Sequence, residues 1–329
     1  MENFQGLFDK FRSIKVGVVG DVMLDTYMWG SVNRISPEAP VPIVSLSKKD
    51  YRIGGAGNVA LNLQSLGAKA FVLSVTGQDE DADKLNGLFT EHNIAAQYLL
   101  KSTHRITTNK TRVISRNQHM MRLDAEETDD LQAEDEERLI ELFQEFLVKE
   151  KPDLVILQDY NKGVLTKSAI QNILSQCRKS RVLTAVDPKR KNFFEYKDVN
   201  LFKPNLKEVK EALNLLFTNI HLPLLQHIHA ELQQLLHHQA SFITLSDKGV
   251  FYQQENKSSI IPSHLRNIAD VSGAGDTVIA VGALVYAATG NVHLMAEVAN
   301  IAGGLVCEEV GTVAVDRQKL LHECELLLC

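Results

Sequence analysis

The sequence predicts an α/β fold in which helices cover both faces of a mostly parallel sheet. Apolar runs that are rich in β-branched residues and closed by Gly or Asp recur along the chain, and segments of helical period lie between several of them. Strands that alternate with helices imply right-handed crossovers, which place helices on both faces of a parallel sheet. The predicted strands are Ile14–Gly20, Ala70–Gly77, Asp153–Asp159, Val182–Asp187 and Ser241–Ser246.

Two segments interrupt this alternation, and we expect them to form a small antiparallel β lid outside the main sheet. Residues 31–52 hold Pro37, Pro40 and Pro42 between short apolar stretches, and residues 105–124 read as extended chain without a helical period. Prolines suit edge strands, although two long surface loops remain the alternative. No repeat and no linker rich in Gly, Ser or Pro divides the chain, so residues 1–329 are expected to form one domain that carries this lid.

Two further segments are predicted to be helical. Leu131–Lys149 places Leu139, Phe143 and Phe146 on one face. Residues 277–296 contain no Asp, Glu, Lys or Arg, but Gly290 divides them into halves that are shorter than the roughly 20 residues a membrane span needs. We therefore expect two buried helices joined by a glycine turn.

Composition excludes several classes of protein. With 44% apolar residues and a net charge of −6, the chain has the content of a folded protein and no general positive field for nucleic acid. The first residues lack the basic and apolar regions of a signal peptide, so a cytoplasmic location without a membrane partner is expected. The four cysteines show no spacing typical of zinc sites or disulfides, and the histidines at 227, 229, 237 and 238 lack metal-ligand spacing and suggest an exposed helix.

The segment Gly55-Ala56-Gly57-Asn58-Val59-Ala60 fits the G-x-G-x-x-G/A pattern of dinucleotide-binding proteins. That pattern requires a strand directly before the glycines, which then open a helix. The preceding residues 48–52 are charged and make a poor buried strand, so the sequence does not favour a dinucleotide site.

The segment Gly273-Ala274-Gly275-Asp276, followed at once by an apolar helix, is a stronger signal for phosphate. A helix that opens on a Gly-Ala-Gly turn directs unpaired backbone N–H groups and the positive end of its dipole toward one point. Asp276 in the first turn is either a cap and dipole partner or a general base beside a bound phosphoryl group.

Three ordered motifs resemble those of the ribokinase-type (PfkB) carbohydrate kinases. Residues 270–277 resemble the C-terminal signature of the family, residues 54–60 its N-terminal Gly-Gly signature, and residues 203–208 its P-N-x-x-E motif. Within the family the closest resemblance is to the D-glycero-β-D-manno-heptose-7-phosphate kinases. The segments that carry it are residues 20–25, 33–42, 110–113, 122–124, 159–163 and 187–189.

This resemblance implies a ribokinase-like fold and transfer of the γ-phosphoryl group of ATP to the C1 hydroxyl of heptose 7-phosphate. Asp276 would accept the hydroxyl proton, while the turn formed by Gly273, Ala274 and Gly275 would stabilise the charge on the transferred group. The departures from the family pattern, Gly57, His119 and residues 311–315, concern the shape of the sugar and adenine pockets.

The resemblance also places ATP and Mg²⁺. Asn205 and Glu208 would hold the magnesium–phosphate assembly through water, although an Asn followed three residues later by Glu is equally typical of a helix cap. The remaining nucleotide residues implied by the match are Leu206, Lys207, Ser246, Gly249 and Asn300.

For the acceptor sugar, Asp25 is expected at the C-terminal end of a strand, near Gly54, Gly55 and Asn58. A phosphorylated substrate needs a cation. Lys162 is the first choice for this role, and the other candidates are Lys189, Arg112 and Arg34.

The lid would close over the sugar, and family members often pair through such lids, so we expect a homodimer. Because homologues that fuse this kinase to a nucleotidyltransferase are longer, that second activity is expected on another chain. Two alternatives remain open: a kinase for another sugar or nucleoside, and a sugar-sensing protein without catalysis.

Overall fold

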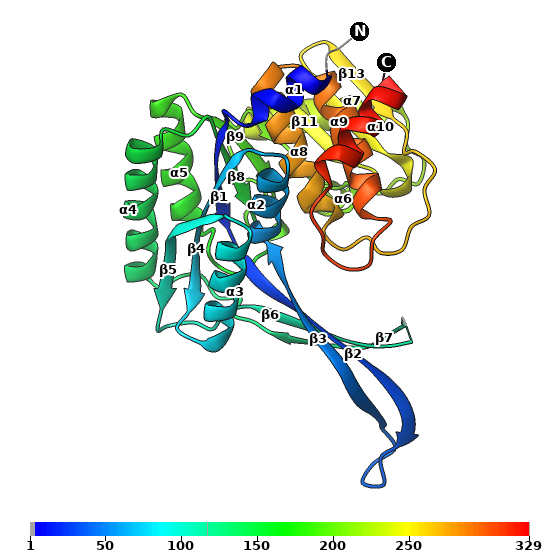
Figure 1. The fold of residues 1–329 in the computed structure, drawn as a ribbon. Coiled ribbons are helices and arrows are strands. Elements are labelled where there is room, and N and C mark those ends of the chain that lie inside the picture. Colours follow the sequence, from blue (N-terminus) through cyan, green and yellow to red (C-terminus); the bar gives the residue numbers. More distant parts are fainter. Residues whose placement is uncertain (1–3, 117, 329) are drawn as a thin grey trace.

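The computed structural model describes residues 4–116 and 118–328, and a nine-stranded sheet lies at its centre (Figure 1). Its strands are β1 (Lys15–Gly20), β4 (Lys69–Gly77), β5 (Ala95–Ser102), β8 (Leu154–Gln158), β9 (Leu183–Asp187), β10 (Leu201–Phe202), β11 (Ala240–Thr244), β12 (Val250–Gln254) and β13 (Lys257–Ile261). Their order is β13-β12-β11-β10-β9-β8-β1-β4-β5. Pairing is parallel from β11 to β5, and β12 and β13 add an antiparallel edge.

Helices cover both faces of this sheet, as the sequence predicts. One apolar cluster packs α1 (Phe4–Phe11), α2 (Ala56–Ser65), α3 (Glu80–Glu91), α8 (Ala274–Thr289), α9 (Val292–Val306) and α10 (Arg317–Leu328) against one face. A second cluster packs α4 (Ala133–Glu150), α5 (Lys167–Ser180), α6 (Leu206–Ala212) and α7 (Leu222–Leu236) against the other. The α/β fold class is therefore confirmed.

Each of the five predicted core strands is present within a residue or two of its expected bounds, as β1, β4, β8, β9 and β11. The predicted helix at 131–149 is α4. The charge-free stretch from 277 forms α8 and α9, which meet at Gly290 in the left-handed conformation (φ 64°) that favours glycine. Among the described residues, no helix has the length and apolarity that crossing a membrane would require.

The lid is a separate four-stranded sheet that projects from the body of the molecule (Figure 1). Its strands, in the order β3-β2-β6-β7, are β2 (Val22–Ile35), β3 (Pro42–Gly55), β6 (Asn109–Ser115) and β7 (Gln118–Ala125). The expectation of a purely antiparallel lid is wrong, because β2 and β6 pair in parallel. The lid also starts earlier than expected, at Val22, since this strand follows β1 after a single residue.

Residues 48–52, before the Gly55-Ala56-Gly57 turn, make a poor buried strand as the sequence predicts, because they are exposed or half-buried. Strand β3 runs directly into α2, but it belongs to the lid and pairs antiparallel with β2. Gly55 makes the turn at φ 60°, where a Cβ would lie 2.3 Å from the carbonyl oxygen of Asp21. The turn thus joins lid to body, in a different setting from the buried parallel strand of a dinucleotide fold.

The expected exposed helix around the histidines is half-buried. His229 of α7 and His238 both lie in the interior and hydrogen bond with the Ser241 hydroxyl, at 2.8 and 2.6 Å. Burial lowers the pKa of His229 to about 4 and that of His238 to about 3, so both rings are neutral at pH 7. The helical pattern of the sequence does not show this burial, because Ser241, the polar partner of both rings, comes from β11.

Candidate active site

Asp276 lies at the centre of a polar cluster where three parts of the chain meet. It occupies the first turn of α8 and is 2% exposed. Its carboxylate accepts hydrogen bonds from the Asn58 amide of α2 (3.0 Å), the Gln158 amide at the end of β8 (3.1 Å) and the Tyr160 hydroxyl (2.6 Å). A carboxylate with three fixed donors has one orientation, which a proton-transfer group needs.

The surroundings of Asp276 tune its acidity toward neutral pH. Burial raises its pKa to about 7, and the nearby Asp187 carboxylate adds to the rise. The hydrogen bonds from Tyr160 and Asn58 and the charge of Lys203 act in the opposite direction. A carboxylate with a pKa near 7 can both accept and release a proton at physiological pH.

A buried ion pair lies beside this carboxylate. Asp187 ends β9 and Lys203 follows β10, and their charged atoms are 2.9 Å apart in the interior. The Gln158 amide also donates to Asp187, at 3.2 Å, so it links the ion pair to Asp276. Neighbouring parallel strands thus present polar side chains at the same edge of the sheet, where ligands gather in α/β folds.

The predicted Gly-Ala-Gly turn opens α8 toward this ion pair. Gly273 has a φ of 78°, and a Cβ there would lie 2.8 Å from the Asn58 amide nitrogen. A Cβ on Gly275 would lie 3.9 Å from Asp187 and 4.0 Å from the Lys203 ammonium nitrogen. The first turn of α8, which begins at Ala274, therefore lies beside a buried lysine. That arrangement suits an anionic phosphoryl group.

The motif at 205–208 forms the helix cap that the sequence left open as an alternative. The Asn205 side chain accepts the Glu208 N–H at 2.9 Å, and Glu208 accepts the Asn205 N–H at 2.8 Å. The other Glu208 oxygen accepts a hydrogen bond from the Lys189 ammonium. Amide and carboxylate oxygens suit Mg²⁺. The side-chain oxygens of Asn205 and Glu208 each keep a lone pair for a water molecule, whereas direct binding of the ion to Glu208 would displace Lys189.

The other residues implied for the nucleotide lie in α6, in α9 and in the turn after β11. Ser246 and Gly249 flank a short turn after β11, with φ of 60° and 92°. Asn300 of α9 donates to the Pro262 carbonyl at 2.8 Å, so its amide holds the 262 loop. Leu206 begins α6, and the Lys207 side chain points to solvent with 84% of its surface exposed.

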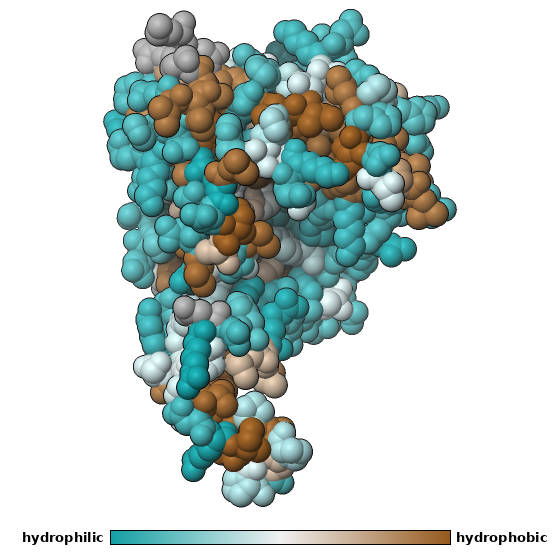
Figure 2. Space-filling view, turned by 90° about the vertical axis from the view of Figure 1, so that its right-hand side faces the viewer, coloured by the Kyte–Doolittle hydropathy of each residue, from teal (hydrophilic) through white to brown (hydrophobic). Residues whose placement is uncertain are grey.

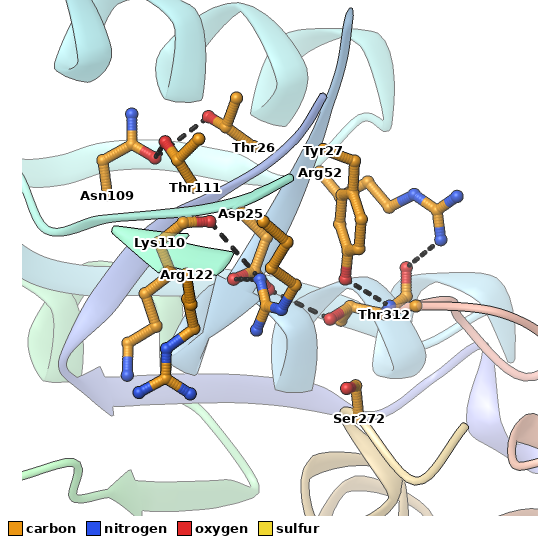
Figure 3. Close-up of polar contacts among 12 residues, drawn as sticks. Asp25, Thr26, Tyr27, Arg52, Asn109, Lys110, Thr111, Arg122, Ser272 and Thr312 are labelled. Atoms are coloured by element: carbon orange, nitrogen blue, oxygen red, sulfur yellow. Dashed lines mark hydrogen bonds and ion pairs between the residues drawn. The ribbon is translucent and has the colours of Figure 1, made fainter. Parts of the chain in front are cut away.

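Asp25 belongs to the lid, and its expected place at the end of a core strand is wrong. It lies in β2, where it pairs with Arg112 of β6 at 2.6 Å and accepts the Thr312 hydroxyl at 3.0 Å (Figure 3). A Cβ on Gly54 would lie 2.7 Å from the Asp25 carboxylate, so only glycine leaves this oxygen its space. Asn58, the other predicted sugar contact, donates to Asp276.

Three of the four cations predicted for a substrate phosphate are paired with acids. Lys162 contacts Glu126 at 2.6 Å, Lys189 contacts Glu208, and Arg112 contacts Asp25. The fourth, Arg34, lies exposed near the tip of the lid. Of these, Lys162 lies two residues beyond Tyr160, which touches Asp276.

The structure adds lid cations that sequence reasoning did not single out for this role. Lys110 of β6 and Arg122 of β7 are close enough to influence each other electrostatically, and both extend from the lid near Asp25 (Figure 3). Burial lowers the pKa of Lys110. The sequence held a signal for Lys110, because residues 110–112 read Lys-Thr-Arg. The two-residue period of a strand places Lys110 and Arg112 on the same face.

Asp21 organises the loop that carries Tyr160 and Lys162. Its buried carboxylate accepts the backbone N–H groups of Tyr160, Lys162 and Val164, at 2.8, 3.1 and 3.1 Å. Sequence reasoning assigned no role to Asp21, Gln158, Tyr160, Asp187 or Lys203. Their common signal is a polar residue at or just beyond the carboxyl end of an apolar strand, or in the loop that follows it.

Comparison with known proteins relates the chain to a family of kinases. The profile of the "pfkB family carbohydrate kinase" matches residues 13–319. The chain is 38% identical over 311 residues to "Bifunctional protein HldE" of Desulfatibacillum aliphaticivorans and 39% identical over 311 residues to that of Methylobacillus flagellatus. Each alignment covers 94% of this chain but only 63% and 62% of those proteins, so the chain spans less than two thirds of their length.

Solved structures agree on the fold. Phosphofructokinase-2 from Escherichia coli, in complex with potassium, aligns with a TM-score of 0.77 at 17% identity, over 95% of this chain and 99% of that one. Ribokinase from Arabidopsis thaliana, complexed with ribose and ATP, aligns with a TM-score of 0.71 at 15% identity, over 94% and 98%. The family profile spans nearly the whole chain, and the chain belongs to the pfkB family of carbohydrate kinases.

Proposed function

We propose that this kinase transfers the γ-phosphoryl group of ATP to the C1 hydroxyl of D-glycero-D-manno-heptose 7-phosphate. The product would be heptose 1,7-bisphosphate, a precursor of lipopolysaccharide cores. The observation that carries the proposal is Asp276, a buried carboxylate with a pKa of about 7 at the start of a helix that faces Lys203. The resemblance of residues 33–42, 110–113 and 122–124 to heptose-7-phosphate kinases supports the choice of sugar.

In this reaction Asp276 accepts the proton of the attacking hydroxyl. Tyr160, Gln158 and Asn58 hold its carboxylate in place, so little reorganisation is needed at the moment of transfer. The N–H groups of Ala274, Gly275 and Asp276 itself stabilise the charge on the transferred group.

Asn205 and Glu208 hold the magnesium–phosphate assembly through water, and Lys189 adds a positive charge beside Glu208. When bound, Mg²⁺ supplies charge neutralisation on the phosphate oxygens. Ser246, Gly249 and Asn300 lie on the adenine side.

On the acceptor side, Asp25, Gly54, Gly55 and Asn58 contact the sugar, and basic side chains, Lys162 first among them, bind its phosphate. The lid carries exposed apolar residues on β2, β3, β7 and the loop between β2 and β3, and Figure 2 shows apolar side chains gathered on this projecting part. Such a surface favours a second copy of the chain, so we propose a homodimer formed through the lid. The exposed apolar residues are Ile35, Val41, Leu46, Met120, Met121 and Leu123.

ATP use is consistent with the cytoplasmic location that we propose.

A coupled ADP-release assay across a panel of sugars tests the acceptor. We expect turnover with heptose 7-phosphate and much weaker turnover with fructose, ribose, fructose 6-phosphate and nucleosides. Preference for a neutral sugar would replace the heptose by another acceptor. If none of the sugars in the panel raises ADP release, the chain would be a sugar-sensing protein without catalysis.

A further inference from the structure

The lid and the body are joined by an ion pair at one corner of the proposed acceptor site. Glu126 directly follows β7 of the lid, and Lys162 lies in the loop after β8 of the body. One Glu126 oxygen is 2.6 Å from the Lys162 ammonium nitrogen, and the side chains are 22% and 12% exposed. Both charges are therefore largely removed from solvent, which strengthens their interaction.

Two ammonium groups share this single carboxylate. The second Glu126 oxygen is 3.9 Å from the Lys110 ammonium nitrogen, and it is buried without a hydrogen-bond donor among the described residues. Arg122 is already engaged by Asp124 at 2.9 and 3.0 Å, so it does not satisfy that oxygen. The corner thus holds an excess of positive charge around an incompletely bonded carboxylate, and a buried polar atom left in this way is unfavourable.

The backbone positions of the two lysines are held by the fold rather than by Glu126. Asp21 holds the N–H of Lys162, and the Arg105 guanidinium donates to the Lys162 carbonyl. Lys110 lies in β6 opposite Asp25 of β2, the residue proposed to contact the sugar. Both side chains would therefore still start from the same backbone positions if Glu126 withdrew, and an anion with more acceptor oxygens could bridge both ammonium groups.

We propose that Lys110 and Lys162 bind the anionic end of the acceptor and that Glu126 occupies this site until the acceptor displaces it. Glu126 is then a specificity-determining residue, because it weakens the binding of phosphorylated acceptors and leaves that of neutral sugars unchanged. This inference rests on the proposed function for the identity of the acceptor, but the competition between Glu126 and an anion can be measured without turnover.

Binding of inorganic phosphate to the full chain, measured by isothermal titration calorimetry, tests the competition directly. We expect Glu126→Gln to bind phosphate about three- to tenfold more tightly than the wild type, since a partly buried carboxylate no longer competes. Lys162→Met should lose most of the binding. Glu127→Gln makes the same charge change one residue away, near Arg105, and should bind phosphate like the wild type.

Unchanged or weaker phosphate binding by Glu126→Gln would overturn the proposal, because the ion pair would then serve only to hold the lid. An equal gain in Glu127→Gln would overturn it too, since net charge alone would explain the effect. If Glu126→Gln fails to fold, Glu126→Asp retracts the carboxylate by one methylene and should shift binding in the same direction.

Kinetics separate this inference from the proposed function. With heptose 7-phosphate, Glu126→Gln should lower KM for the sugar several-fold with little change in kcat or in KM for ATP. If the chain does not use heptose 7-phosphate but phosphate binding still responds to Glu126→Gln, the proposed acceptor is wrong and the inference stands. If turnover is normal and phosphate binding does not respond, the inference alone fails.

Discussion

Replacing Asp276 by asparagine tests the proposed proton acceptor. The change removes the negative charge, yet the asparagine carbonyl can still accept the hydrogen bonds from Gln158 and Tyr160. A general base contributes about 100- to 10,000-fold to a rate, or about 3–5 kcal/mol of activation free energy. We therefore expect kcat of Asp276→Asn to fall by several orders of magnitude while folding and ATP binding are retained.

The pH profile gives the same test a second readout. The base must be deprotonated to act, so wild-type kcat/KM should fall as the pH drops below about 7, the pKa to which burial raises Asp276. ADP release in a coupled assay measures both quantities, and thermal unfolding and nucleotide titration report on folding and binding. Asp316→Asn makes the same chemical change at the residue before α10, where the side chain accepts the Lys319 N–H, and should keep normal turnover. Turnover of Asp276→Asn within tenfold of the wild type would refute the assignment.

Three further results follow from the same cluster. Tyr160→Phe removes a hydrogen bond to the charged carboxylate, so the acid limb of the pH–rate profile should move up by about one to two pH units. Lys203→Met leaves Asp187 as an unpaired buried charge and should lower the free energy of unfolding by about 3–5 kcal/mol, as measured in urea. The pKa of Asp276 is higher in the folded chain than its usual 3.8, so folded stability should decrease as the pH rises from about 4 to about 7. Asp276→Asn should flatten that decrease.

The sequence predicts the core of this fold well because local pattern and tertiary environment agree there. The strand at 14–20 is buried on both faces, so its near-continuous apolar run is unambiguous. The Gly-Ala-Gly turn before Asp276 is equally local, since the left-handed Gly273 and the apolar helix after it are neighbours in the chain.

Features that depend on distant partners are the ones that the sequence does not reveal. The parallel pairing of β2 with β6 joins segments more than 80 residues apart, and nothing in either segment specifies that direction. The burial of His229 depends on Ser241, and the role of Gln158 depends on Asp187 and Asp276, which two other elements supply. The predicted place of Asp25 at the end of a strand is wrong because β2 begins only one residue after β1 ends.

The identity of the product tests the central claim most directly. After incubation of the chain with ATP, magnesium and heptose 7-phosphate, phosphorus NMR of the sugar product should show two phosphomonoester signals, one of them coupled to the anomeric proton. That result would establish transfer to the C1 hydroxyl. A single phosphate signal, with ATP unconsumed, or a second phosphate coupled to a proton other than the anomeric one would contradict the account.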